Sequence, residues 1–89
     1  MKHKLQINPD LIWRELNDET VIVSPPVGEY CVLNGMGSVI WQLLTDEHEQ
    51  QDIEVYLVTH FDVTEEQARQ DVDRFLADLH KRGMILWAS

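Results

Sequence analysis

Apolar residues alternate with polar ones in the first third of the chain, a spacing that is typical of strands. Residues 11–16 and 20–23 predict two strands, and residues 17–19 between them have a turn composition. A proline-containing connection, residues 24–28, cannot continue a ladder, so residues 29–33 predict a third strand. Residues 4–7 also alternate and predict an extra edge segment, whose place in the sheet is left open.

From residue 35 onward apolar residues recur every three or four positions, which predicts helices over about 35–44, 52–60 and 64–82. Asn34 is expected to cap the first helix with its side chain. Thr64 and Gln67 read as a capping box, and Gly83 as the residue that ends the third helix. Residues 84–87 form an apolar tail that is expected to fold back. The fold class is therefore α+β: a small three-stranded antiparallel sheet followed by three helices, the composition of a winged helix-turn-helix.

The chain length and composition suit one small folded domain over residues 1–89. Hydrophobic residues make up 44% of the sequence, and no apolar run approaches the ~20 residues that span a bilayer. The N-terminus lacks the apolar segment of a signal peptide. The single cysteine, Cys31, has no partner for an internal disulfide and is expected to be a small core residue. These features predict a cytoplasmic protein.

The net charge of −9 is concentrated in one part of the chain. Residues 45–73 carry ten acids against one base, Arg69. Such a field repels phosphate and anionic membranes and attracts cationic partners, although acidic faces also simply keep a small protein soluble. The third helix, at 64–82, is itself net negative, which disfavours a winged-helix DNA-binding regulator. We therefore expect neither a nucleic-acid nor a membrane partner.

Catalytic and metal-binding patterns are weak. The four histidines are scattered, and none stands at metal-ligand spacing from a carboxylate. Cys31 has no candidate base nearby in sequence. The segment 35–37 has two glycines but lacks the rest of a dinucleotide or phosphate-loop fingerprint, so a structural turn is expected there. The sequence predicts a protein that is not an enzyme and has no cofactor.

Peptide binding has the better physical case, because an exposed sheet edge is a template for another strand. If the strand at 29–33 is an edge, the helix at 64–82 can form the opposite wall of a groove. We expect Cys31 and Leu33 to face the core, and Tyr30 and Val32 to lie nearer a guest. On the helix, Val72, Leu76 and Leu79 are the expected core positions. A neighbouring stripe at three- and four-residue spacing can face the groove: Ala68, Asp71, Phe75, Asp78 and Arg82. The alternative is that the aromatic residue of this stripe is plain core and its acids plain surface. The candidate peptide-binding residues are Glu29, Tyr30, Cys31, Val32, Leu33, Ala68, Asp71, Val72, Phe75, Asp78 and Arg82.

Several short motifs resemble those of one family. They are Tyr30-x-x-Leu33-Asn34, Ile40-Trp41-x-Leu43-Leu44, Asp71-Val72, Phe75-Leu76, Leu79, and Arg82-Gly83-Met84-Ile85. In order and spacing they are similar to the PqqD-like family, the recognition elements for precursors of ribosomally made, modified peptides. The resemblance spans roughly residues 11 to 87. One departure is the acidic segment 45–50, where the family usually has an Asp-Gly turn.

This resemblance implies a winged-helix fold and a specific role. Family members bind the leader segment of a precursor peptide as an added strand between the third strand and the third helix, and present it to a separate enzyme. A free-standing member looks like the recognition protein of lasso peptide pathways, whose partners are a leader peptidase and a cyclase. Alternatives are the peptide chaperone of pyrroloquinoline quinone biosynthesis, and a module that binds a folded protein. A monomer or weak dimer is expected.

Overall fold

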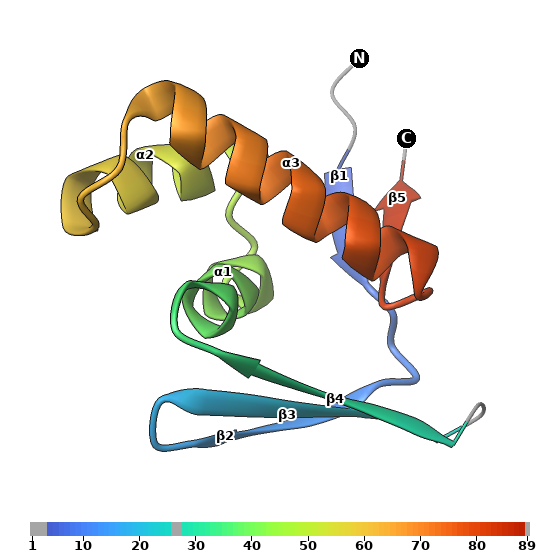
Figure 1. Ribbon diagram of the computed structural model, residues 1–89. Helices are drawn as coiled ribbons and strands as arrows, with labels where there is room; N and C mark the ends of the chain where they lie inside the picture. Colours follow the sequence, from blue (N-terminus) through green and yellow to red (C-terminus); the bar gives the residue numbers. More distant parts are fainter. Residues whose placement is uncertain (1–3, 26–27, 89) are drawn as a thin grey trace.

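The computed structural model describes residues 4–25 and 28–88, so Pro26 and Val27 of the predicted connection lie outside the described residues. Two groups of strands and three helices make up the fold (Figure 1). The strands are β1 (Lys4–Ile7), β2 (Ile12–Leu16), β3 (Glu19–Ser24), β4 (Glu29–Asn34) and β5 (Ile85–Ala88). The helices are α1 (Met36–Thr45), α2 (Gln50–His60) and α3 (Glu65–Lys81). The α+β class, with a three-stranded antiparallel sheet followed by three helices, is confirmed.

The main sheet has the order β2-β3-β4, so β4 is an edge strand. Its register places Ile22 of β3 opposite Cys31 of β4, and Val21 opposite Val32. Thr20 and Ile22 are fully buried, which fixes the face that packs on the helices. Figure 1 shows all three helices on that side of the sheet.

The two ends of the chain meet in a separate ribbon, in which β1 pairs antiparallel with β5. The expected extra edge segment at residues 4–7 therefore does not join the main sheet. The apolar tail does fold back, and β1 is its pairing partner. Beyond the ladder, the Asn8 side chain donates to the Gly83 carbonyl at 2.9 Å, which ties the start of the chain to the end of α3.

The core lies between the sheet and the helices, and its largest side chain, Trp41, is fully buried. Ile53 and Leu57 are buried and anchor α2 on α3, whereas Tyr56 and His60 of the same helix stay exposed and stack on each other. One polar contact crosses the core: the hydroxyls of Thr20 and Ser38 lie 2.5 Å apart and join β3 to α1.

The start of α1 differs from expectation. Asn34 continues the ladder opposite Glu19, and the N-cap is Gly35, which makes no side-chain capping bond. The backbone at this position has φ 55° and ψ −129°, a conformation that glycine adopts without the steric cost of a side chain. The expectation that Asn34 caps the helix is therefore wrong, because the turn needs its irregular residue one position later.

The ends of α3 largely follow the sequence prediction. Thr64 is the N-cap, and its hydroxyl accepts from the Gln67 N–H at 3.1 Å. The Gln67 side chain donates to Asp71, so it does not reach back as a capping box requires. At the other end Gly83 has φ 74°, and the Met84 N–H donates to the Leu79 carbonyl, which is the Schellman arrangement.

Candidate functional site: a strand edge and a facing helix

The exposed edge of β4 is the first component of the site. The side chains of this strand alternate: Leu33 is buried and Cys31 half-buried against the core, while Tyr30 and Val32 are exposed. The predicted choice of core-facing residues is thus confirmed. Since β4 has a neighbour only on its β3 side, every second residue of the strand points its N–H and C=O away from the sheet.

Helix α3 lies beyond this edge without packing closely on it. β4 packs against β3 and α1, whereas α3 packs mainly on α2 and β5. Between the start of α1 and the middle of α3 is an open cavity of about 460 Å³. It is lined by Met36, Gly37 and Ile40 of α1 and by Asp71, Arg74, Phe75 and Asp78 of α3. This groove between α1 and α3 has an apolar floor and a charged rim.

Gly37 allows a close approach between α1 and the Phe75 ring of α3. A Cβ placed on Gly37 would lie 3.3 Å from the Phe75 ring and 3.8 Å from the Leu33 side chain. The residue thus brings the end of β4, the start of α1 and the middle of α3 together. Phe75 is half-buried and lines the cavity, so it belongs to the core and to the groove wall at once.

Charged side chains border the groove on α3. Asp71 is half-buried and accepts a hydrogen bond from Gln67 at 2.8 Å. Asp78 is paired with Arg82 one helical turn later, at 3.2 Å from its Nε. Arg82 also donates to the Cys31 sulfur at 3.8 Å, and so spans the distance from α3 to β4. The Asp78–Arg82 pair is solvent-exposed and contributes only about 0–1 kcal/mol to stability.

Not all of the predicted site residues reach the surface of the groove. Ala68 and Val72 are fully buried in the core, so their side chains lie behind the wall. Leu33 likewise points into the core. The structure does bring Asp71, Phe75 and Asp78 together on one wall. The sequence argument missed Met36, Gly37, Ile40 and Arg74, since periodicity predicts which face of α1 is apolar but not that its first turn borders α3.

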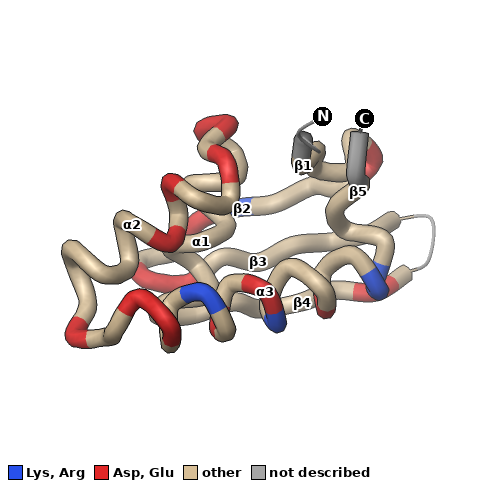
Figure 2. Tube along the Cα trace, turned by 90° about the horizontal axis from the view of Figure 1, so that it is seen from above, with Lys and Arg blue, Asp and Glu red and all other residues tan. Residues whose placement is uncertain are grey.

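Negative charge surrounds the helical side of the molecule. In Figure 2 most of the acidic residues lie along α2, α3 and the segment between α1 and α2, while the middle of the sheet carries few charges. An ion pair between exposed Arg69 and half-buried Glu54 joins α3 to α2 at 3.8 Å. The groove therefore opens beside an acidic surface, which favours cationic guests.

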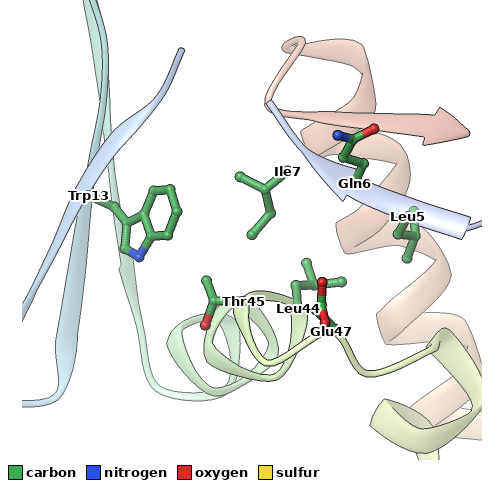
Figure 3. A pocket seen from close by; sticks show the side chains of 7 residues that line it. All are labelled: Leu5, Gln6, Ile7, Trp13, Leu44, Thr45 and Glu47. Atoms are coloured by element: carbon green, nitrogen blue, oxygen red, sulfur yellow. The ribbon is translucent and has the colours of Figure 1, made fainter. Parts of the chain in front are cut away.

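A second cavity, of about 400 Å³, lies on the β2 side of α1 (Figure 3). Its lining comes from β1, β2, the end of α1 and the segment that follows α1: Leu5, Gln6, Ile7, Trp13, Leu44, Thr45 and Glu47. Trp13 faces this cavity with about a third of its surface exposed. The ring also packs edge-on against Trp41, with centroids 5.5 Å apart, so Trp13 serves packing as well as surface. The cavity does not touch the β4 edge.

Two further properties bear on the chemistry. Within residues 4–25 and 28–88, no cluster of three or more His, Cys, Asp or Glu is arranged to hold a metal ion. In the same part of the chain, no helix is both long enough and apolar enough to cross a membrane.

Comparison with known proteins agrees with this geometry. The model of the family described as coenzyme PQQ synthesis protein D (PqqD) matches residues 19–85, more than half of the chain. This match confirms the resemblance that the sequence motifs indicate. No curated protein sequence matches the chain.

Two solved structures have the same fold. TbiB1 in complex with the TbiA(beta) leader peptide has a TM-score of 0.88 and 24% identity, over 90% of this chain and 93% of that one. Lasso peptide synthetase B1 complexed with the leader peptide has a TM-score of 0.87 and 25% identity, over 93% of this chain and 98% of that one.

Proposed function

This chain belongs to the PqqD family, and from that premise we propose that it binds the leader segment of a ribosomally made precursor peptide. The guest adds as a strand to the edge of β4, in the groove whose far wall is α3. The observation that carries this proposal is the free edge of β4 beside a cavity of about 460 Å³. The two similar structures, each of which holds a leader peptide, support it.

Both the backbone of β4 and the side chains of the groove contribute to binding of the guest. Each strand-addition hydrogen bond contributes only about 1 kcal/mol net, so pockets must supply the remaining affinity and the specificity. Phe75 and Ile40 offer an apolar floor for one side chain of the guest. Asp71 and Asp78 on the rim favour a Lys or Arg of the guest.

The role proposed is delivery rather than catalysis. A domain that holds the substrate near a separate active site raises the effective concentration there and lowers no chemical barrier itself. The partners are the leader peptidase and the cyclase of a lasso peptide pathway, which act in the cytoplasm. The protein needs no cofactor, binds neither nucleic acid nor membrane, and works as a monomer or weak dimer. The family match also keeps a second candidate: the peptide chaperone of pyrroloquinoline quinone synthesis.

The test is fluorescence anisotropy of labelled leader peptides encoded beside this gene, titrated with purified protein. Saturable binding at micromolar concentration or tighter, lost when the leader is scrambled, is the expected result. A pyrroloquinoline quinone precursor peptide in a parallel titration separates the two candidate pathways. Folded protein that binds none of these peptides would overturn the proposal.

A further inference from the structure

The face of the main sheet that points away from the helices is uncovered and apolar. Because Thr20 and Ile22 point to the core, the residues that alternate with them on β3, Val21 and Val23, point outward. The register places Ile12 and Tyr30 on either side of Val23. All three helices lie on the other side of the sheet (Figure 1).

Several large apolar side chains of this face are widely exposed. The solvent-accessible fractions are 62% for Ile12, 54% for Leu16, 73% for Tyr30 and 46% for Val32. We call the outward side chains of these three strands the outer sheet face. Adjacent apolar residues that remain exposed, in contrast to single ones, mark interaction sites.

The outer sheet face also differs from the rest of the surface in charge. The chain has a net charge of −9, but the charged residues in outward register positions on β2, β3 and β4 are Arg14 and Glu19, one of each sign. Figure 2 shows most of the acidic residues on α2, on α3 and on the segment that joins α1 to α2. Depletion of charge with retention of aromatic and aliphatic residues is what distinguishes the centre of a protein interface.

The position of the leader peptide indicates which partner this face suits. A strand added to β4 extends the sheet to the order β2-β3-β4-guest. Alternate side chains of the guest then project beside Tyr30 and Val32 on the outer sheet face. A protein docked on this face touches the recognition domain and the bound peptide at the same time.

We infer that the outer sheet face is the docking surface for the enzyme that processes the bound leader peptide, an inference that rests on the proposed function. The complementary surface of that enzyme is apolar, with a carboxylate placed for Arg14. Because the enzyme contacts both protein and guest, leader binding and enzyme docking strengthen each other by the same factor.

The test measures binding of the leader peptidase encoded beside the precursor gene to this protein by biolayer interferometry, with and without the leader. Ile12→Asp and Leu16→Asp change the outer sheet face on β2, the strand farthest from the β4 edge. We expect each to weaken peptidase binding at least tenfold and to leave leader affinity, measured by anisotropy, within twofold of wild type. Val55→Asp on α2, at 60% exposure a match for Ile12, is the control and should leave both affinities unchanged.

The other outcomes separate the two proposals. Wild-type peptidase affinity in both β2 variants would overturn the docking inference, while normal leader binding would keep the proposed function. Loss of leader binding by Ile12→Asp would indicate misfolding, and Ile12→Thr, which keeps a β-branched residue, then provides the peptidase measurement. A wild-type dimer in sedimentation that Ile12→Asp dissociates, with peptidase affinity unchanged, would assign the face to a second copy and refute the inference. A wild type that binds the peptidase but no leader would refute the proposed function instead.

Discussion

Proline at Val32 tests strand addition at the β4 edge most directly. Val32 lies in the middle of the strand, opposite Val21, with its side chain on the outer sheet face. We take Ser24 and Glu29, the pair that closes the β3–β4 loop, as a hydrogen-bonded pair. Hydrogen-bonded and non-hydrogen-bonded pairs alternate along an antiparallel ladder, so the Val32 N–H then points away from β3. Proline at this position removes a donor that the folded protein does not use internally.

The expected loss follows from the number of main-chain bonds. Half of the six residues of β4 point outward, and each offers one N–H and one C=O to a guest. The proline removes one donor, and its ring keeps the guest from approaching at the neighbouring bond. Two bonds at about 1 kcal/mol each give a loss of about 2 kcal/mol, or roughly thirtyfold in affinity.

Anisotropy with the labelled leader measures this loss, and thermal unfolding followed by circular dichroism verifies the fold. Val32→Thr keeps the N–H and the β-branched shape, and should bind within about twofold of wild type. A folded Val32→Pro protein with wild-type affinity would remove this position from the binding edge. An unfolded Val32→Pro protein would show instead that the N–H belongs to the β3 ladder, and would refute the assumed alternation.

Three more predictions concern α3. Asp71→Arg should weaken binding of a basic leader about tenfold at low salt and less at high salt, because it replaces an attraction with a repulsion. Anisotropy at two salt concentrations measures this loss, with Asp73→Arg at an exposed position as the control. An affinity that equals wild type at both salt concentrations would contradict the prediction. Thr64→Ala should lower the free energy of unfolding by about 1 kcal/mol and the Tm by roughly 4–8 °C, because the hydrogen bond to the Gln67 N–H is lost. A Tm equal to that of Thr64→Ser would show that this capping bond does not stabilise the protein. Gly83→Ala should lower the free energy of unfolding in urea by about 1–2 kcal/mol. The loss comes from the backbone φ of 74° alone, because an added Cβ would meet no atom within 4 Å. Unchanged stability would mean that the end of the helix adopts another conformation.

The elements of this fold could be predicted from the sequence where local pattern decides them. Alternation placed β2, β3 and β4, and helical spacing placed α1, α2 and α3, each within about two residues of the observed bounds. Pairing between distant segments is different, because a sheet edge accepts any strand that reaches it. Residues 4–7 carry the same alternation whether they join the main sheet or pair with residues 85–88. Only the packing of the whole chain distinguishes these arrangements.

The groove shows the same division between local and distant information. The spacing of Asp71, Phe75 and Asp78 placed them on one wall correctly. The same spacing wrongly placed the Ala68 side chain in the groove wall. Residues three and four apart do not stay exactly above one another along a helix, so the stripe shifts around the helix until Ala68 faces the core. The role of Gly37 in the groove depends on how closely α1 approaches α3. The sequence pattern of a single helix does not determine that distance. The nearby Gly35-x-Gly37 pattern combines two different needs: an irregular backbone at the first glycine and a close approach at the second.

β4 takes part in the core, in the proposed leader site and in the proposed docking surface, because it presents different chemical groups on its two faces and along its edge. Toward the helices, Leu33 and Cys31 contribute to the core. Along the edge, the backbone provides the pairing groups that we assign to the leader peptide. On the outer sheet face, Tyr30 and Val32 belong to the surface that we assign to the enzyme. The two faces of the strand point in opposite directions and the edge is perpendicular to both, so a substitution on one of them leaves the other two largely intact. Folding, leader binding and enzyme docking are therefore separable by single substitutions in one strand, and a mutant set in which all three always fail together would argue against this division of β4.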